Sequence, residues 1–242
     1  MSEAVSISDA AATAEDFEFA ALEEAKNYRA ALVQEFRAFL KGHVLEIGAG
    51  IGQITRHLLE LSEIKRLASV EPDPKFCAAH RAQFPDYELY EGTVEIVAPD
   101  QRWDALLSIN VLEHIEDDEC ELRRYAIRLR ETRGVFCLLV PARQEIYAPI
   151  DRSFGHFRRY DRRQLRQKLE AAGFQILHLH YFNFVGYFAW WLNFTFLGKQ
   201  YFEPAKVRFY DRVIFPVTYR IETNVLRPPF GQSLIAIARA TA

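Results

Sequence analysis

An apolar strand meets a glycine-rich turn in HVLEIGAGIG, residues 43–52. Val44, Leu45 and Ile47 have the chemistry of a buried strand. The glycines that follow allow a tight turn and let a ligand approach the backbone where a Cβ atom would clash. The stretch therefore predicts a nucleotide-type cofactor site at the end of a buried strand.

A carboxylate is expected beside this turn. A second apolar run, at 67–70, ends in Glu71. In a doubly wound α/β sheet, an acidic residue at the tip of the second strand accepts hydrogen bonds from ribose hydroxyls. The two strand ends together predict a ligand that contains a ribose.

The glycine spacing separates two kinds of ligand. A dinucleotide site requires G-x-G-x-x-G, so that a helix N-terminus faces the pyrophosphate. This chain has Gly48, Gly50 and Gly52 instead, and Glu46 precedes them. A carboxylate at that point suits a cationic amino or sulfonium group better than a pyrophosphate. The pattern favours a positively charged nucleoside over NAD.

Four motifs follow one another in the order typical of one enzyme family. VLEIGAGIG (44–52) resembles motif I of class I S-adenosylmethionine-dependent methyltransferases, and SVEPD (69–73) resembles their ribose-binding strand end. WDALLSINVLEH (103–114) and GVFCLLVP (134–141) resemble the next two strands of the small-molecule type 11/12 subgroup. The resemblance covers roughly 40–182 and 233–239. It implies an α/β fold with a Rossmann-like doubly wound seven-stranded sheet, the last strand antiparallel, and S-adenosyl-L-methionine as the cofactor.

Strands and helices alternate along the chain, which predicts a parallel sheet covered on both faces. The expected strands are 43–48, 66–71, 87–91, 103–109, 134–140, 174–181 and 233–239, and the expected helices are 51–61, 74–83, 117–131 and 161–172. Residues 1–14 are expected to be a disordered N-terminus. Residues 15–242 are expected to form a single methyltransferase domain with an N-terminal cap helix at 15–41 and an aromatic-rich helical insertion or lid at about 183–231, called the insertion below.

Composition limits the function classes. The chain has 242 residues, 50% of them hydrophobic, so it can bury a full core. A net charge of −3 gives no general basic field, so nucleic-acid binding is not expected. The three cysteines lack metal-type spacing, and no secretory signal is seen. We expect a cytoplasmic enzyme acting on a small-molecule acceptor.

A run of aromatic residues, YFNFVGYFAWWLNFTFL (181–197), leads into the insertion. A membrane span would need about 20 apolar residues, which this run does not reach. Two other interpretations remain, and both can hold. The aromatics pack a helical hairpin, or they form a lid over an apolar substrate pocket that also contacts a membrane surface. Trp190 and Trp191 are the candidates for substrate binding.

The resemblance also assigns cofactor contacts to residues near the strand ends. We expect the cofactor to contact Tyr28, Glu46, Gly48, Ala49, Gly50, Glu71, Pro72, Gly92, Thr93, Asn110 and Val111. In this set, Gly92 and Thr93 would lie near the adenine, and Asn110 near the methionine portion. Gly92 departs from the family, which often has Asp at the adenine contact.

A second candidate region is GHFRRYD (155–161), which resembles the GH-[FY]-RRY stretch of the subgroup. Guanidinium groups suit carboxylates and phosphates, so Arg158, Arg159 and Tyr160 are expected to orient an anionic or hydroxylated substrate. The alternative is that the arginines form ion pairs with the protein's own acids.

The implied reaction is an in-line displacement at the sulfonium methyl group, with S-adenosylhomocysteine leaving as a neutral thioether. Holding the nucleophile, methyl carbon and sulfur in line supplies much of the acceleration. His114 and His156 are the candidate bases for a protonated acceptor, because imidazole titrates near neutral pH. Each has a structural interpretation as its alternative. His178 and His180 share a strand face but have no third ligand at suitable spacing, so no metal is expected.

The acceptor is expected to be a small, partly apolar or aromatic molecule methylated on O or N. Two other classes fit parts of the pattern. A non-catalytic S-adenosylmethionine-binding or scaffold protein would be expected to lose the cofactor residues, which are present here. A nicotinamide-dependent oxidoreductase would need the third glycine of the dinucleotide pattern.

Overall fold

The computed structural model describes residues 23–225 and 227–241. The predicted disordered segment 1–14 and the first residues of the predicted cap helix lie outside the described residues. At the centre is a seven-stranded sheet with the order β3-β2-β1-β4-β5-β7-β6. The strands are β1 (Gly42–Ile47), β2 (Ile64–Glu71), β3 (Glu88–Glu91), β4 (Ala105–Ile109), β5 (Val135–Pro141), β6 (Phe174–Phe182) and β7 (Ser233–Ala240).

Only β7 runs against its neighbours in this sheet. It pairs antiparallel with β5 and with β6, whereas β1 to β5 pair in parallel. The expected α/β fold class, with its last strand antiparallel, is therefore confirmed. The carboxyl ends of the parallel strands meet at one edge of the sheet, where ligands bind in such folds.

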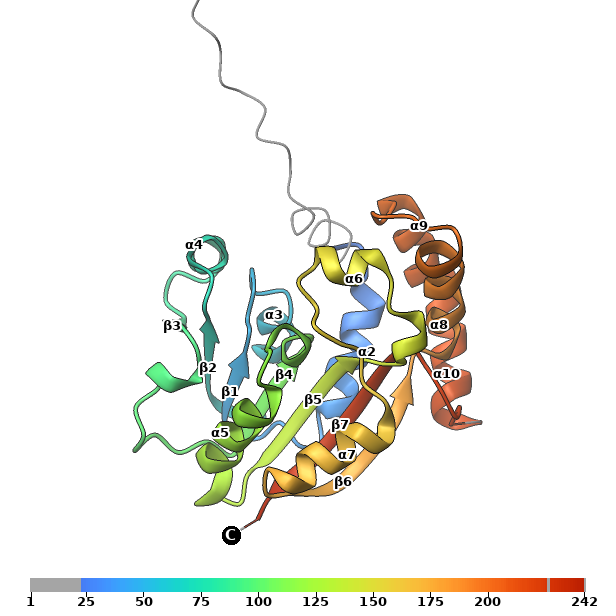
Figure 1. The fold of residues 1–242 in the computed structure, drawn as a ribbon. Helices are drawn as coiled ribbons and strands as arrows, with labels where there is room; N and C mark the ends of the chain where they lie inside the picture. Colours follow the sequence, from blue (N-terminus) through green and yellow to red (C-terminus); the bar gives the residue numbers. More distant parts are fainter. Residues whose placement is uncertain (1–22, 226, 242) are drawn as a thin grey trace, which may run out of the picture.

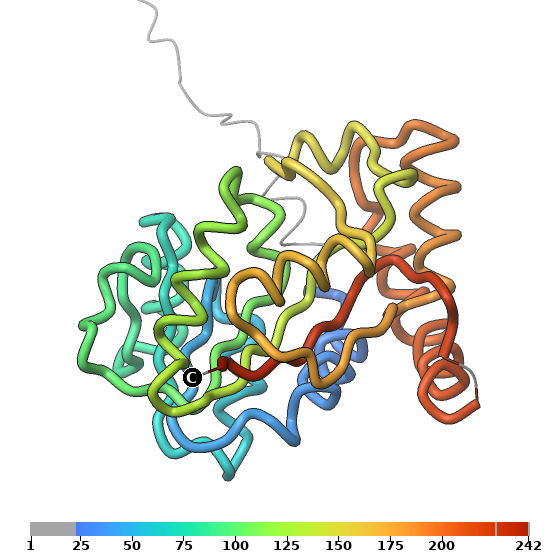
Figure 2. Tube along the Cα trace, turned by 60° about the horizontal axis from the view of Figure 1, so that its bottom comes forward, coloured from blue at the N-terminus to red at the C-terminus, as the bar shows by residue number. Residues whose placement is uncertain are grey.

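Helices cover both faces of the sheet (Figures 1 and 2). They are α2 (Lys26–Phe36), α3 (Thr55–Leu58), α4 (Pro74–Gln83), α5 (Asp118–Arg130), α6 (Pro149–Ser153), α7 (Arg162–Ala171), α8 (Phe184–Trp190), α9 (Pro204–Phe209) and α10 (Phe215–Asn224). Short 3-10 turns η1 (Val94–Ile96), η2 (Leu112–His114) and η3 (Gln144–Ile146) and the π-helical turns η4 (Trp191–Phe196) and η5 (Tyr210–Ile214) complete the chain.

The prediction of a helix at 51–61 was wrong in extent. The structure has a helix only at α3, Thr55–Leu58. Gly52 has a φ of +88°, and its N–H donates to the carbonyl of Ala49, so the chain is still turning where the helix was expected to begin. By contrast, the helix predicted at 74–83 coincides with α4, which Asp73 caps through the N–H of Lys75.

Two hydrophobic clusters lie on opposite faces of the sheet. Leu122 and Leu129 of α5 and Leu165 of α7 pack on one face, and Leu32 and Phe36 of α2 pack on the other. Because successive strand residues alternate between faces, Leu45 and Ile47 of β1 join the first cluster while Val44 joins the second. Glu46 consequently points to the face covered by α2 and α3.

The insertion is helical, as expected, and two carboxylates fasten it to the sheet domain. Asp211 of η5 accepts hydrogen bonds from the N–H groups of Asn27 and Tyr28 in the first turn of α2, at 3.0 and 2.8 Å. Glu222 of α10 accepts from the N–H groups of Asn183 and Phe184, where α8 begins. Carboxylates at helix N-termini satisfy N–H groups that have no partner within the helix. The insertion is thereby a fixed layer beside α2.

None of the helices in the described part of the chain is long and apolar enough to cross a membrane.

Candidate active site

The glycine turn after β1 is built as its sequence requires. Gly48 and Gly50 have φ values of +73° and +53°, which favour glycine. A Cβ atom on Gly48 would lie 2.4 Å from Cγ2 of Val111, so the turn after β1 packs closely against the segment after β4. The N–H groups of Gly48 and Ala49 both donate to the carbonyl of Val70 in β2. The turn is thus held at the ends of three neighbouring strands.

Glu46 anchors this turn from inside the protein. Its Oε2 accepts hydrogen bonds from the hydroxyls of Thr55 and Ser69, at 2.6 and 2.8 Å. Thr55 also contacts the His80 ring, and Ser69 contacts the Tyr87 hydroxyl. Burial raises the pKa of Glu46 to about 7, in spite of the two hydroxyl donors. A positive charge brought near this carboxyl would favour its ionised form.

Glu71 lies at the tip of the next strand and faces the glycine turn. Its Oε2 accepts from the N–H of Gly50 at 2.8 Å, and its Oε1 accepts from the N–H of Asp73 at 3.0 Å. Burial raises the pKa of this carboxyl, and the two backbone donors oppose the shift. Glu71, the residue predicted to bind the ribose, therefore lies beside the turn predicted to bind the methionine portion.

The other predicted cofactor residues follow the same edge of the sheet. Gly92, which follows β3, donates its N–H to the carbonyl of Glu71 at the end of β2. Pro72 and Thr93 are exposed. Asn110 follows β4, is exposed and has a φ of +52°. Strand ends β1 to β4 thus present the whole predicted set, apart from Tyr28, along one edge.

A cavity of about 420 Å³ lies between this edge and the insertion. Its floor includes Asn110, Pro141 and Ser233, which follow or belong to β4, β5 and β7, and its other wall comes from the insertion. The aromatic lining residues are Tyr28, Phe154, Trp190, Phe194, Tyr201, Phe202, Phe209 and Tyr210, and the polar ones include His156, Arg159, Asn183, Lys199, Glu203, Lys206, Asp211 and Gln232. The cavity is largely aromatic with a few polar groups, as in sites for small molecules.

Tyr28 lies at this cavity rather than at the glycine turn. Its ring packs against Phe182 and Phe215, with centroids 5.4 and 5.3 Å away. Burial raises its pKa to about 12, so its hydroxyl stays protonated at neutral pH. α2 therefore contributes a hydrogen-bond donor to the wall of the cavity.

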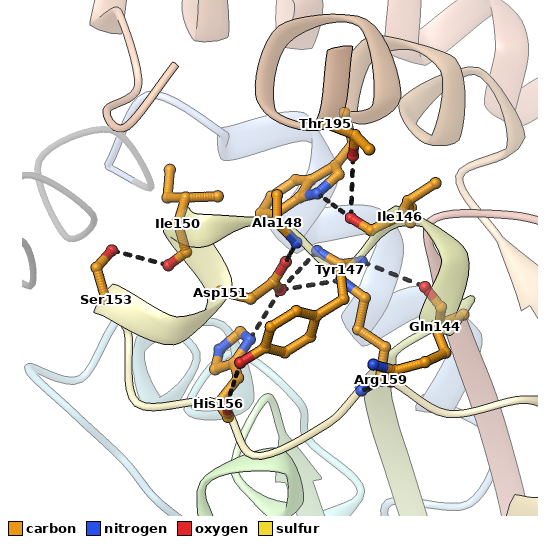
Figure 3. A network of polar contacts seen from close by, with 12 residues as sticks. Gln144, Ile146, Tyr147, Ala148, Ile150, Asp151, Ser153, His156, Arg159 and Thr195 are labelled. Carbon is orange, nitrogen blue, oxygen red and sulfur yellow. Dashed lines mark hydrogen bonds and ion pairs between the residues drawn. The ribbon is translucent and has the colours of Figure 1, made fainter. Parts of the chain in front are cut away.

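One buried carboxylate, that of Asp151, organises the polar end of the cavity (Figure 3). Oδ1 of Asp151 accepts from Nε and Nη2 of Arg159, at 2.9 and 2.8 Å, and contacts Nδ1 of His156 at 3.1 Å. The Tyr147 hydroxyl donates to the carbonyl of His156 at 2.7 Å. These contacts fix the His156 ring and leave its Nε2 as the nitrogen not used by Asp151.

His114 meets His156 edge to face, with ring centroids 4.7 Å apart. Its pKa is lowered, first by desolvation in the cluster and then by the neighbouring His156 imidazole. Two adjacent imidazoles disfavour double protonation. The structure thus brings the two histidines predicted as bases to one place, and the lowered pKa of His114 favours its neutral form.

The Arg-Arg-Tyr stretch is divided between two locations. Arg159 is buried, lines the cavity and lies over the Trp190 ring, with Cζ 4.2 Å from the ring centroid. Arg158 instead pairs with Asp118 at 3.0 Å and donates to the carbonyl of Glu116. The Tyr160 hydroxyl donates to Asp118 at 2.8 Å. Arg158 and Tyr160 lie outside the cavity lining. Both arginines pair with acids of the protein, Arg158 with Asp118 and Arg159 with Asp151, as the alternative interpretation expected.

The two tryptophans are also divided. Trp190 is buried and donates its Nε1–H to the carbonyl of Ile146 at 3.1 Å. Trp191 is 42% exposed and stacks on Phe196. Only Trp190 lines the cavity.

Sequence reasoning missed Asp151 and Glu113. Asp151 stands five residues before His156, in a segment with no helical or strand periodicity, and a carboxylate close to a Gly-His pair was the available signal. Glu113 was part of the Leu-Glu-His match but was given no role. His178 and His180, which share a strand face, take separate partners in Phe39 and Glu35.

Comparisons with known proteins identify the family of the chain. A family model described as a methyltransferase domain matches residues 21–179. Among curated proteins, the chain matches one described as probable ribosomal RNA small subunit methyltransferase A in two strains of Halobacterium salinarum, with 40% identity over 62 residues. The match covers 26% of this chain and 21% of the relative, so the chain spans about a fifth of the length of these relatives.

Solved structures share the fold. The Haloferax volcanii complex between the Trm112 methyltransferase activator and a methyltransferase aligns with a TM-score of 0.61 and 16% identity, over 95% of this chain and 96% of that chain. An S-adenosylmethionine-dependent methyltransferase from Mesorhizobium loti aligns with a TM-score of 0.58 and 18% identity, over 90% of this chain and 99% of that chain. A Bacillus halodurans methyltransferase aligns with a TM-score of 0.59 and 19% identity, over 88% of this chain and 99% of that chain. At these identities the likeness establishes the fold alone.

Glu46→Gln should change how stability depends on pH. The folded-state pKa of Glu46, about 7, lies above its ordinary 4.5. The group therefore stabilises the folded state below about pH 4.5, and this contribution is lost as the pH rises through 7. At about 1.36 kcal/mol per pKa unit, the loss is on the order of 3 kcal/mol. Glutamine retains an oxygen for Thr55 and Ser69 but does not titrate.

Urea unfolding of the cofactor-free protein between pH 4.5 and 8 measures this effect. The wild-type free energy of unfolding should fall relative to that of Glu46→Gln across the range. Parallel curves for the two proteins would show that Glu46 titrates normally.

Proposed function

The chain belongs to the class I S-adenosylmethionine-dependent methyltransferases, and from this premise we propose that it methylates an oxygen or nitrogen atom of a small, partly apolar or aromatic acceptor. The observation that carries the proposal is the aromatic cavity between the strand ends and the insertion. Its volume of about 420 Å³ suits a small molecule. Its lining includes Asn110, one of the residues proposed to contact the methionine portion of the cofactor.

The cofactor is proposed to lie along the strand ends. The glycine turn and Asn110 hold the methionine portion, Glu71 accepts from the ribose hydroxyls, and Gly92 and Thr93 lie near the adenine. Glu46 acts through the turn that it anchors, and its negative charge favours the cationic sulfonium form over the neutral product. The acceptor approaches from the cavity, opposite the sulfur.

The transfer is an in-line displacement. The acceptor atom forms a bond to the methyl carbon while the carbon–sulfur bond breaks, and the electron pair of that bond stays on sulfur. Because the leaving group is a neutral thioether, no acid is needed, and alignment of the three atoms contributes most. An acceptor that arrives protonated loses its proton at the His114–His156 end of the cavity.

The same cavity favours a small acceptor over RNA. It is bounded by the insertion and by Phe154 of the loop after α6, and the protein has no net positive charge. The match between this chain and the ribosomal RNA methyltransferases extends over only 62 residues. The acceptor class is tested by incubating the enzyme and a labelled methyl donor with small phenols, hydroxy acids, amines or an RNA fraction. The label transferred to each is then measured. Transfer to RNA alone would contradict the proposal.

A cytoplasmic location, expected from the sequence, is part of the proposal.

Glu71→Ala should weaken cofactor binding without unfolding the protein. It removes two charge-assisted hydrogen bonds to the ribose, each worth about 1.5 to 3 kcal/mol. Isothermal titration with S-adenosylhomocysteine measures the loss, and NAD and ATP should not raise the melting temperature of the wild type. Glu91→Ala is the matched control, because Glu91 is an exposed carboxylate at the end of the neighbouring strand. Equal affinities in Glu71→Ala and wild type would exclude Glu71 as the ribose ligand.

Trp190→Ala and Trp191→Ala should differ, although the residues are adjacent. Trp190 lines the cavity and is buried, so its truncation should raise the acceptor KM more than the cofactor KM and lower stability by about 3 to 5 kcal/mol. Trp191 is outside the lining, so Trp191→Ala should leave both constants close to wild type. If Trp190→Ala unfolds, Trp190→Phe replaces it in the test, because phenylalanine keeps an aromatic ring in the wall of the cavity. An unchanged acceptor KM in folded Trp190 variants would argue against the cavity as the acceptor site.

The outer face of the insertion supports peripheral contact with a membrane. Most exposed large hydrophobic side chains in the described part of the chain lie between 188 and 225. A stripe recurs every four residues along α9, η5 and α10, and consists of Phe209, Val213, Val217, Ile221 and Val225. Arg208, Arg212 and Arg220 are exposed next to it. α9 and α10 lie at one outer edge of the molecule, beside α8 (Figure 1). An apolar stripe flanked by arginines suits an anionic lipid surface.

Val213→Glu with Val217→Glu should abolish this contact. The wild type should sediment with vesicles containing phosphatidylglycerol, less with phosphatidylcholine alone, and less at high salt. Ile127→Glu is the control, because Ile127 is an equally exposed apolar residue on α5. Both variants should keep the thermal shift with S-adenosylhomocysteine. Failure of the wild type to bind either vesicle would contradict the membrane contact, and dimerisation through the stripe would point to a second copy instead.

A further inference from the structure

Three metal-ligating side chains converge beside the cavity. They are Glu113 and His114 of η2 and His156 of the loop after α6, and one ligand atom from each lies within 4.8 Å of the other two. Glu113 is buried, the His156 side chain is 8% exposed, and His114 reaches solvent. His156 belongs both to this cluster and to the cavity lining. Glu113 and His114 are adjacent in the sequence, and the fold brings His156 to them from more than forty residues away.

Both imidazoles have an orienting partner for one nitrogen. Nδ1 of His156 contacts Oδ1 of Asp151 at 3.1 Å, and His114 is hydrogen bonded to the carbonyl of Phe154. Metal-bound histidines almost always donate their second N–H to a carboxylate or a backbone carbonyl. Asp151 is itself fixed by Arg159 and by the N–H of Ala148. The supporting contacts of a metal centre are therefore present as well as its ligands.

The donor set identifies the class of ion. Two imidazoles and one carboxylate are the ligands of zinc sites that keep an open position. Imidazole favours first-row transition ions, whereas Mg²⁺ and Ca²⁺ prefer oxygen ligands. Metal–ligand bonds of about 2.0 to 2.2 Å place ligand atoms about 3 to 4 Å apart. Binding thus requires only a small inward movement of these side chains.

We propose that Glu113, His114 and His156 bind one divalent transition-metal ion whose open position faces the acceptor cavity. This inference rests on the proposed function and specifies how the acceptor is deprotonated. An acceptor hydroxyl bound to the ion has a lowered pKa and releases its proton to water. Its oxygen then forms the bond to the methyl carbon, and the carbon–sulfur pair stays on sulfur. The histidines act as ligands and need not accept the proton.

Metal titration of the full chain tests the site without an acceptor. After treatment with EDTA and dialysis, isothermal titration with Zn²⁺ or Mn²⁺ should show one ion per chain, and Mg²⁺ should bind at least about tenfold more weakly. His114→Gln and His156→Gln should each weaken the binding of Zn²⁺ at least about tenfold. His114→Gln is the safer variant for folding, because His114 is exposed. His178→Gln is the control and should retain wild-type binding.

A thermal shift with S-adenosylhomocysteine separates the two proposals. Wild type that binds S-adenosylhomocysteine but no Zn²⁺ or Mn²⁺ overturns the metal site and leaves the proposed function standing. The same holds if folded His114→Gln and His156→Gln bind Zn²⁺ as tightly as the wild type does. Full methyl transfer by metal-free enzyme would also overturn the inference, and would return the role of base to His156. Wild type that binds metal but no S-adenosylhomocysteine contradicts the proposed function instead.

Discussion

The Asp151 carboxylate is the contact on which the polar end of the cavity depends. It is fully buried and accepts from Arg159, His156 and the N–H of Ala148 at once. Burial by itself raises the pKa of Asp151, but the hydrogen bonds from His156 and Arg159 hold it below its usual value. Removing one partner of a buried ion pair typically costs about 3 to 5 kcal/mol. Through Arg159 the same carboxylate reaches the Trp190 ring, so the loop and the insertion share one support.

A second constraint is the alternation of side chains along parallel strands. Glu46 lies before the end of β1 and points to the face covered by α3. There the hydroxyls of Thr55 and Ser69 donate hydrogen bonds to its carboxylate. Glu71 is the last residue of β2, where the chain leaves the sheet, and it turns toward Gly50. Two carboxylates on neighbouring strands therefore have different tasks. One holds the turn from inside, and the other borders the space above the strand ends.

The central strands β1, β4, β5 and β7 could be predicted from the sequence because each is a largely apolar run between turns. The helix expected at 51–61 could not be placed as closely, since Gly52 extends the turn. The loop at 155–161 was recognised by composition, but composition does not say which way each side chain points. Arg158 and Arg159 are neighbours with different partners, Asp118 and Asp151. Both acids come from other segments, so the division depends on the folded chain.

The two sides of the helical insertion have different surroundings. Neighbouring residues point about 100° apart on a helix, so Trp190 can face the cavity while Trp191 faces outward. Trp190, Phe194 and Phe154 form one buried cluster, and the same cluster is a wall of the cavity. Packing and pocket formation are therefore one event. A substitution that loosens this cluster should widen the cavity as it destabilises the fold, and the aromatic residues on the outer side remain free to contact another surface.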